Sequence, residues 1–383
     1  MLRDKFFFCL VIVGYFVDKC EEMLKNEFQF AGVGVSPCTV LSPMAGVTDA
    51  PFRRLCRILS GNRMGLLVSE FVSTDGTSPF VLKNRKQLHF YPEERPFGIQ
   101  IFGRDPERMA YAAQVLESLR PDYIEVNAGC PVPKVAGKGG GAGLLKDLPR
   151  LAKILSEVKK AIAIPMTLKC RVGWDENSIN VMETLKIAEA EGADMLTVHG
   201  RTRVQGYNGF ADWNLIGEVA AAARIPVVGN GDVSSVQSAL EKLEKYAISG
   251  VSIGRGALHN PWLFGEIADA LEGKPARDVS AQEACGIFKI YYELMAEGCE
   301  SSPFGMLGRL KQLAARLCKG FEPDSSEFRQ RVLTSQSLEE LFENADRFAE
   351  FAQSNGIRFN PSRLVNLNGR KENSVSFDRQ FKG

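Results

Sequence analysis

The sequence predicts a (β/α)8 TIM barrel followed by a small all-helical domain. Eight short apolar runs recur between residues 37 and 254, and helical patterns separate most of them, which is typical of a parallel barrel. Most of the runs end in glycines and polar residues. Barrels of this kind build their active sites at the carboxyl ends of their strands. The pattern then becomes helical throughout from Ser280 to about Ser354, so we expect an enzyme with a second, helical domain.

Each predicted strand is a short, nearly continuous apolar run, as expected for strands covered on both faces. The eight strands are predicted, in chain order, at Cys38–Gly46, Leu66–Phe71, Phe97–Gly103, Tyr123–Pro131, Met166–Gly173, Met195–Arg201, Pro226–Asp232 and Gly250–Gly256.

Changes of composition divide the chain further. Gly273–Asp278 is a polar linker that contains glycine and proline. Ser280 and Glu283 form a capping box that begins a domain of three or four helices without strands. The predicted parts are an N-terminal extension (1–35), the barrel (36–272), the helical domain (280–355) and a polar tail predicted to be disordered (356–383).

The extension contains an apolar run, Phe6–Val17, that follows Arg3 and Lys5. It is shorter than the roughly 20 residues that span a bilayer as a helix, and acidic residues rather than a cleavage site follow it. Three interpretations stay open: a start that is not native, an extra helix packed on the barrel, and a membrane or export signal.

Composition limits the partners that the chain needs. The net charge of the 383 residues is +1, so a nucleic-acid surface would have to be a local patch. The nine cysteines show no C-x-x-C pair, and the three histidines are dispersed. This pattern argues against a disulfide framework and a metal site, and it favours a cytoplasmic protein without a membrane partner.

The last two predicted strands end in glycine turns, Asn230–Asp232 and Gly254–Gly256. In barrels of this class the loops after strands seven and eight commonly bind phosphate. Glycines let backbone N–H groups approach an anion, and Arg255 adds a charged donor. Two such turns in these positions favour a phosphate site over two plain tight turns.

Polar side chains also lie within or directly after other strands: Gln100, Lys169, Arg171, His199 and Arg201. Each alone is most simply a satisfied core residue. Together they suit a flat heterocycle with carbonyl and ring-nitrogen acceptors, bound in the mouth of the barrel.

The fourth predicted strand leads into Asn127 and Cys130, which Pro131 and Pro133 follow. The stretch Gly137–Gly143 holds five glycines, so we expect it to be mobile and able to fold over a ligand. A cysteine in such a turn at a barrel mouth is a candidate proton donor or nucleophile.

Taken together, these residues resemble the tRNA-dihydrouridine synthases. The resemblance runs from about Leu41 to Phe264 and continues in the helical domain. Its motifs, in order, are SPMAGVTDAPFR, GIQIFGRDPE, VNAGCPVPK, GKGGGAGLL, LKCRVGW, TVHGRTRVQGY, ADW, VVGNGD and GRGALHNPWLF. It implies an FMN-bound barrel, NADPH as reductant, and reduction of uridine in the D-loop of tRNA.

The resemblance also assigns roles to residues. Cys130 matches the catalytic cysteine, and the helical domain would bind tRNA, with Arg316 and Lys319 beside the residues named below. The residues implied to hold the flavin are Pro43, Met44, Ala45, Gln100, Asn127, Lys169, His199, Asn230, Gly231, Asp232, Gly254 and Arg255. Those expected to contact tRNA are Lys138, Arg171, Arg201, Arg203, Arg309 and Lys311.

Two other functions stay open: a small-molecule FMN oxidoreductase of the dihydroorotate or ene-reductase type, and a tRNA-binding protein without catalysis. The helical domain argues against the first, and Cys130 and Lys169 argue against the second. One departure from the family pattern is His259, which stands where a smaller residue is usual and could alter FMN affinity slightly.

Overall fold

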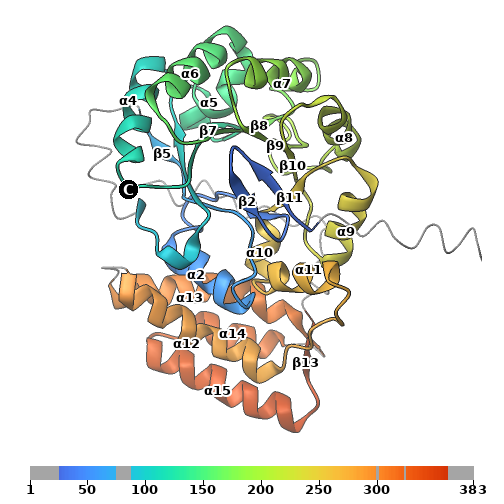
Figure 1. Ribbon diagram of the computed structural model, residues 1–383. Coiled ribbons are helices and arrows are strands. Elements are labelled where there is room, and N and C mark those ends of the chain that lie inside the picture. The colour runs from blue at the N-terminus through green and yellow to red at the C-terminus, as the bar shows by residue number, and fades with distance from the viewer. Residues whose placement is uncertain (1–25, 75–87, 299–301, 323–324, 361–383) are drawn as a thin grey trace, which may run out of the picture.

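The computed structural model describes residues 26–74, 88–298, 302–322 and 325–360 (Figure 1). Its centre is a ring of eight parallel strands, which confirms the predicted TIM barrel. A parallel bridge between Val40 and Leu66 joins the first ring strand to the second and closes the ring. A short further strand, β5 (Val72–Ser73), pairs with β6. The ring strands are β3 (Thr39–Leu41), β4 (Leu67–Val68), β6 (Phe97–Phe102), β7 (Tyr123–Ala128), β8 (Met166–Arg171), β9 (Met195–His199), β10 (Val227–Asn230) and β11 (Gly250–Ile253).

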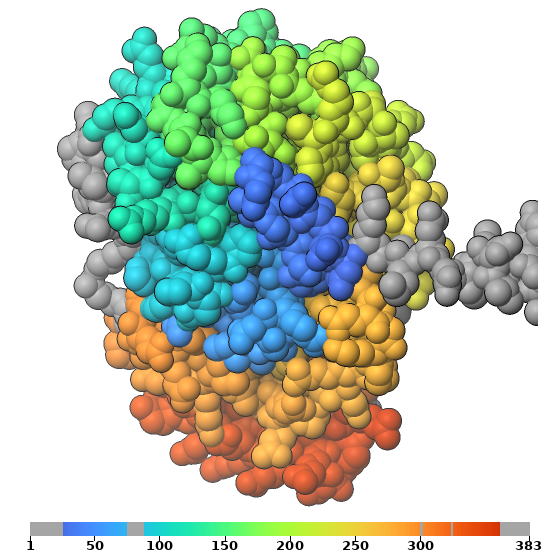
Figure 2. Space-filling model, in the orientation of Figure 1, coloured from blue at the N-terminus to red at the C-terminus, as the bar shows by residue number. Residues whose placement is uncertain are grey.

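A β-hairpin covers the amino-terminal end of the ring. Strands β1 (Phe28–Phe30) and β2 (Val33–Val35) pair antiparallel through a two-residue turn. Ala31 and Gly32 both have positive φ angles, 43° and 83°, as the tight hairpin turn requires. Phe30 packs edge-to-face on Tyr123 inside the barrel, with ring centroids 5.6 Å apart. The hairpin therefore closes the floor of the barrel, and it lies across the face seen in Figure 2.

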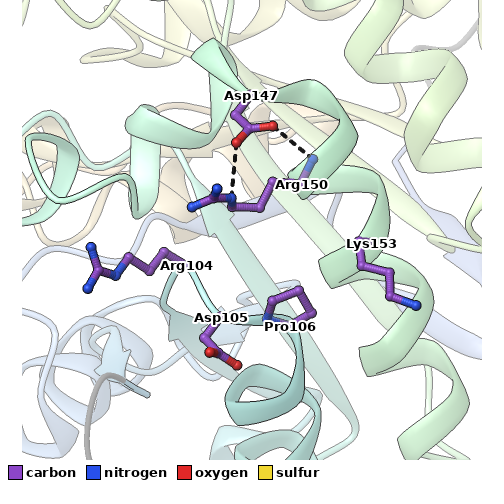
Figure 3. Close-up of a pocket in the computed structure, with 6 residues that line it drawn as sticks. All are labelled: Arg104, Asp105, Pro106, Asp147, Arg150 and Lys153. Carbon is purple, nitrogen blue, oxygen red and sulfur yellow. Dashed lines mark hydrogen bonds and ion pairs between the residues drawn. The ribbon is translucent and has the colours of Figure 1, made fainter.

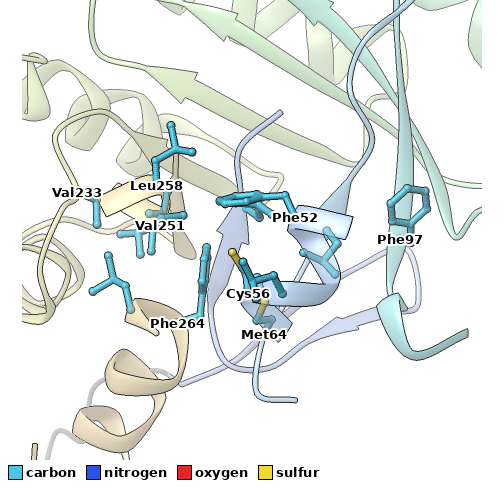
Figure 4. Packing of buried hydrophobic residues seen from close by; sticks show 14 of the residues in the cluster. Phe52, Cys56, Met64, Phe97, Val233, Val251, Leu258 and Phe264 are labelled. Carbon is cyan, nitrogen blue, oxygen red and sulfur yellow. The ribbon is translucent and has the colours of Figure 1, made fainter. Parts of the chain in front are cut away.

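Helices surround the ring, and a continuous apolar core lies beneath them. Figure 4 shows part of this core, where Phe52 and Cys56 of one helix lie near Phe264 of another. Several helices begin at an aspartate whose side chain accepts a backbone N–H, as Asp105 and Asp147 do. The helices around the ring are α2 (Ala50–Leu59), η2 (Pro92–Glu94), α4 (Pro106–Glu117), α5 (Pro133–Ala136), η3 (Gly141–Lys146), α6 (Leu148–Ala161), α7 (Val181–Ala190), α8 (Trp213–Ala222), α9 (Val236–Lys245), α10 (Arg255–His259) and α11 (Leu263–Leu271).

Four α-helices and a 3-10 turn form the C-terminal region, at the bottom of Figure 1. Tyr291 packs edge-to-face on Phe52 of α2, and Arg309 forms an ion pair of 2.6 Å with Asp49, the N-cap of α2. The helical region therefore docks against the segment that follows the first ring strand. Its elements are α12 (Ala281–Gly298), α13 (Pro303–Leu317), η4 (Cys318–Gly320), α14 (Ser326–Thr334) and α15 (Leu338–Ser354).

This region differs from the sequence prediction in two places. We expected no strand in it, yet β12 (Phe321–Glu322) pairs antiparallel with β13 (Arg358–Phe359). We also expected disorder after residue 356, but Phe359 is buried and lies 5.5 Å from Trp262, ring centroid to centroid. The chain needs this aromatic side chain to complete the core, which a polar composition did not reveal. Residues 361–383 lie outside the described residues.

The apolar run Phe6–Val17 also lies outside the described residues, so its three interpretations remain predictions. Among the residues that are described, no helix is long and apolar enough to cross a membrane.

Candidate active site

A chain of side-chain amides runs across the interior of the barrel toward Cys130. The Asn127 Oδ1 atom accepts the backbone N–H groups of Gly129 and Cys130 at 2.9 and 2.8 Å. The Asn127 Nδ2 atom donates to Gln100 Oε1 at 2.8 Å, and Gln100 Nε2 donates to Glu125 Oε1 at 2.7 Å. Backbone donors at one end and a carboxylate at the other leave each amide only one orientation. The turn that carries Cys130 is therefore held from inside the barrel.

A second chain begins on β8, where Lys169 is the register partner of Asn127. Lys169 Nζ donates to Asn230 Oδ1 at 2.9 Å. The amide nitrogen of Asn230 donates to Ser252 O at 2.7 Å and to Ser42 Oγ at 3.1 Å. The predicted residues Lys169 and Asn230 are thus brought together, although 61 positions separate them in the chain.

Burial shifts the acid–base properties of these interior groups. It raises the pKa of Glu125 to about 7, against the effect of Lys169, and it lowers the pKa of Lys169 to about 8, against the effect of Glu125. Burial, together with the nearby Arg171, also holds the pKa of His199 well below its usual range. At neutral pH His199 is therefore a neutral imidazole, and Lys169 is largely a cation.

Cys130 lies under the segment that follows it. Its side chain is 6% exposed, and burial raises the pKa of its thiol above the usual value. Gly141, with a φ angle of +53°, lies so close that a Cβ atom there would come within 2.9 Å of the Cys130 Cβ atom. The amide of Ala142 donates to the carbonyl of Cys130 at 3.1 Å. Only glycine fits at residue 141.

The glycine stretch therefore differs from the mobile loop that we expected. It follows α5 directly and leads into η3, which begins at Gly141, and residues 140–145 are buried. Gly141 packs on the Cys130 turn. Gly137 and Gly143 pack on carbonyls of α5, where a Cβ atom would come within 2.7 and 2.4 Å of a backbone oxygen.

The side chains of Arg171 and Arg201 are also used differently from the prediction. We expected both to neutralise phosphates at the entrance, but each is only 2% exposed. Arg171 donates to the carbonyls of Gly129, Thr202 and Gly206 at 2.8–2.9 Å. Arg201 donates to the carbonyls of Asn208 and Gly209, and it forms an ion pair of 2.7 Å with Asp232. Their donors are used to hold the β9–α8 loop, residues 200–212.

The two predicted glycine turns lie at the carboxyl ends of β10 and β11. Gly231 has a φ angle of +126°, and a Cβ atom there would come within 2.5 Å of the Ala211 side chain. The Asp232 carboxylate lies between two arginines. It pairs with Arg201, and the guanidinium of Arg255 lies 3.7 Å from it. Met44 lies beside Gly254, since its Sδ atom would be 3.5 Å from a Cβ there. The structure thus brings the predicted 43–45, 230–232 and 254–255 segments to one end of the ring.

A family model described as dihydrouridine synthase (Dus) matches residues 40–354, which include the strands of the ring, the Cys130 turn and almost all of the helical region. The chain belongs to the dihydrouridine synthase family. It is accordingly an enzyme, a flavin-dependent oxidoreductase.

Curated relatives support this membership. The chain is 42% identical over 228 residues to the tRNA-dihydrouridine synthase B of Pseudomonas aeruginosa, covering 60% of this chain and 68% of that protein. It is 39% identical to a probable tRNA-dihydrouridine synthase of Rhodobacter capsulatus, with 63% of this chain and 74% of that protein covered. The probable tRNA-dihydrouridine synthase 1 of Synechocystis is 37% identical over 301 residues, with coverages of 78% and 82%.

Solved structures support the fold alone. A 2-naphthoyl-CoA reductase superposes with a TM-score of 0.54 at 12% identity, covering 88% of this chain and 70% of that one. A histamine dehydrogenase from Rhizobium gives a TM-score of 0.51 at 11% identity. The match covers 70% of this chain and 51% of the histamine dehydrogenase chain.

The interior of the dihydrouridine synthase barrel has donors that fit a flavin. Lys169, Gln100 and His199 are polar groups on β8, β6 and β9, and the buried Thr197 hydroxyl has no hydrogen-bond partner among the described residues. Carbonyl and ring-nitrogen acceptors of a flat ring would suit these groups. Arg255 and the two glycine turns suit a phosphate at the rim.

The other residues predicted to contact tRNA differ in how exposed their side chains are and in what they contact. Arg309 is used for the contact with Asp49 and also donates to the hydroxyl of Tyr291 at 2.6 Å. Lys311, on the same helix, is half-buried. Lys138 is exposed on the segment after Cys130, and the guanidinium of Arg203 lies 4.7 Å from the ring centroid of Trp174.

A separate hollow lies on the outer rim, between the starts of α4 and α6 (Figure 3). Its cations and carboxylates come from the same two helix starts, and Asp147 forms an ion pair of 3.0 Å with Arg150. It is distinct from the buried network, and it is lined by Arg104, Asp105, Pro106, Asp147, Arg150 and Lys153.

Sequence reasoning missed Glu125, Ser42 and Ser252, which complete the interior network. A pattern that could have identified Glu125 was present. It stands two residues before Asn127 in a predicted strand, so the two side chains share a face.

Proposed function

We propose that this dihydrouridine synthase reduces uridine to 5,6-dihydrouridine in the D-loop of cytoplasmic tRNA, with FMN as cofactor and NADPH as reductant. The observation that carries the proposal is the Cys130 turn. A buried thiol is held by the amide chain from Glu125 beside a polar interior that suits a flavin. The names of the curated relatives supply the substrate.

The cofactor would be held by residues of several ring strands and of the segments that follow β3, β10 and β11. Lys169 and Gln100 would bind the ring, with His199 and Asn127 beside it, and Pro43, Met44 and Ala45 would lie against it. Asn230, Gly231, Asp232, Gly254 and Arg255 would hold the ribityl chain and the phosphate. A bound FMN would supply hydride chemistry, with NADPH as the hydride source and carbon 6 of uracil as the acceptor.

Cys130 would then protonate carbon 5 of the uracil ring. A general acid must hold its proton at the working pH, and the raised pKa of the Cys130 thiol meets this condition. Asn127 positions the thiol by holding the Gly129 and Cys130 amides. The target base must leave the tRNA stack to reach this buried turn, because the Cys130 side chain is only 6% exposed.

The test supplies purified, FMN-loaded protein with NADPH and an unmodified tRNA transcript. We expect a gain of two hydrogens on one uridine, detected by mass spectrometry of the digested RNA. The steady-state rate of NADPH oxidation should rise when tRNA is added to the enzyme and NADPH. Turnover of a small enone or of dihydroorotate, with no change in the tRNA, would instead support a small-molecule oxidoreductase and refute the proposal.

A further inference from the structure

The β9–α8 loop combines a rigid backbone with exposed apolar side chains. Val204, Tyr207 and Phe210 are 58%, 57% and 80% exposed. Large apolar side chains are costly to hold in water, and groups of them commonly mark binding surfaces. A functional loop on a rigid scaffold is the usual place for such a surface.

The loop backbone is held at many points. Arg171 and Arg201 together donate to the carbonyls of Thr202, Gly206, Asn208 and Gly209. The amides of Arg203 and Val204 donate to the carbonyls of Gly173 and Trp174 at 3.0 and 2.9 Å. The amide that follows Phe210, that of Ala211, donates to Asp232 at 2.7 Å. A ligand that contacts these side chains would therefore meet a preorganised surface.

Arg171 links the loop to the Cys130 turn. Arg171 donates to the carbonyl of Gly129 through Nε and to loop carbonyls through its Nη1 atom. Phe210 is followed by a residue bound to Asp232 at the carboxyl end of β10. The exposed rings thus stand at the rim of the site in which the thiol lies.

Cations surround the aromatic groups of this region. The guanidinium of Arg255 lies 4.9 Å from the ring centroid of Tyr207, and that of Arg171 lies 5.7 Å from it. Lys146 and Arg203 each lie 4.7 Å from the ring centroid of Trp174. Aromatic faces interleaved with cations are typical of surfaces that bind single-stranded nucleic acid, where bases stack and phosphates are neutralised.

We propose that Tyr207 and Phe210 form a stacking surface for an unpaired base of the tRNA, next to the uridine that enters the site. This inference rests on the proposed function, since it names a contact of the same substrate. A base fits better than a phosphate at these rings, which carry no charge. Arg203 and Lys146 supply the charge for the neighbouring backbone.

Phe210→Ala is the cleanest probe, because the ring is almost fully exposed and its loss leaves the fold unchanged. We expect the variant to bind tRNA roughly 5- to 150-fold more weakly, the usual range for losing one base–aromatic stack. Reduction of the flavin by NADPH should keep its wild-type rate, and the rate at saturating tRNA should change little. Tyr111→Ala, which removes an exposed ring from the outer helix α4, is the matched control and should bind tRNA normally.

A second measurement identifies the base. Transcripts with a single abasic site at each unpaired D-loop position are bound to wild-type and Phe210→Ala protein. At the stacked position, the abasic site should weaken tRNA binding by the wild-type protein as much as Phe210→Ala weakens binding of the intact transcript. Phe210→Ala protein should bind the abasic transcript no more weakly than it binds the intact one.

Two results would overturn this inference while leaving the proposed function intact: wild-type tRNA affinity in Phe210→Ala, or a raised KM for NADPH with unchanged tRNA affinity, which would assign the rings to the reductant. The proposed function itself fails in a different experiment, if the wild-type protein leaves every uridine of the transcript unreduced.

Discussion

Tyr123, Glu125 and Asn127 lie on one strand and face the same barrel interior, yet they belong to two different regions. Tyr123 packs in an apolar floor with Phe30, Met195 and side chains from other strands. Four residues further along the strand, Asn127 holds the Cys130 turn. The same change occurs on β9, from Met195 to His199.

This difference shows how one barrel separates stability from chemistry. The floor buries apolar surface and is closed by the β1–β2 hairpin. The opposite end holds polar groups whose pKa values burial has shifted, among them Lys169 and His199. Changes at the floor should therefore alter folding, and changes at the opposite end should alter reaction, ligand binding or pH dependence.

The largest expected effect is at the carboxyl end. Cys130→Ala should slow reoxidation of the reduced flavin by tRNA by about 10²- to 10⁴-fold, because a positioned general acid is lost. NADPH should still reduce the flavin at nearly the wild-type rate. Stopped-flow absorbance of the flavin measures both half-reactions separately.

Cys170→Ala is the control for that variant. Cys170 is fully buried next to Lys169 but belongs to the core between strands and helices, so its loss should affect packing only. A stalled Cys170→Ala, or a Cys130→Ala that tRNA reoxidises at the wild-type rate, would contradict the assignment of the acid.

At the floor, Met195→Ala should lower the free energy of unfolding by about 2–5 kcal/mol, because it leaves a cavity among fully buried side chains. The folded fraction should keep its turnover number. Urea titration gives the first quantity, and activity per folded molecule gives the second. A large loss of turnover without a loss of stability would show that the two ends are not independent.

Acid should lower the free energy of unfolding, because a buried histidine at the carboxyl end of the barrel, His259, would have to take up a proton. Burial, with Arg316, Lys319 and Arg255 nearby, lowers the pKa of His259 to about 4, against about 6.5 in the unfolded chain. The unfolded state thus binds the proton more readily, so stability is full above pH 6.5 and falls as the pH drops toward 4.

The loss attributable to His259 should approach about 3 kcal/mol at pH 4. Urea titrations at pH 7, 6, 5 and 4 would measure this loss, and His259→Gln should flatten the profile. His199, whose pKa is shifted in the same direction, should leave a residual slope. An identical profile in wild type and variant would exclude His259 as a contributor.

The smallest expected effect concerns two neighbouring cations of α13. Lys311→Met should reduce the slope of log affinity for tRNA against log salt by about one, if its ammonium group contacts a phosphate. Arg309→Met should instead lower stability, because Asp49 and Tyr291 lose their partner. Equal salt slopes in wild type and Lys311→Met would remove Lys311 from the tRNA surface.

Much of the fold could be predicted from the sequence because it depends on local patterns. The eight apolar runs each contain a strand of the ring. The helical spacing after Ser280 predicted three or four helices, and the described residues there form four. Strand alternation also placed Lys169 in the interior and Cys170 in the outer core, since successive side chains face opposite sides of a strand.

The tertiary structure alone decided how the long polar side chains are used. Arginine is a residue type that commonly binds phosphate. The guanidinium groups of Arg171, Arg201 and Arg309 nevertheless bind carbonyls or carboxylates within the molecule. Phe359 stands in a polar tail but is buried against Trp262. Whether such a side chain faces water depends on acceptors and rings that remote segments bring to it, and a pattern of neighbouring residues carries no information about those segments.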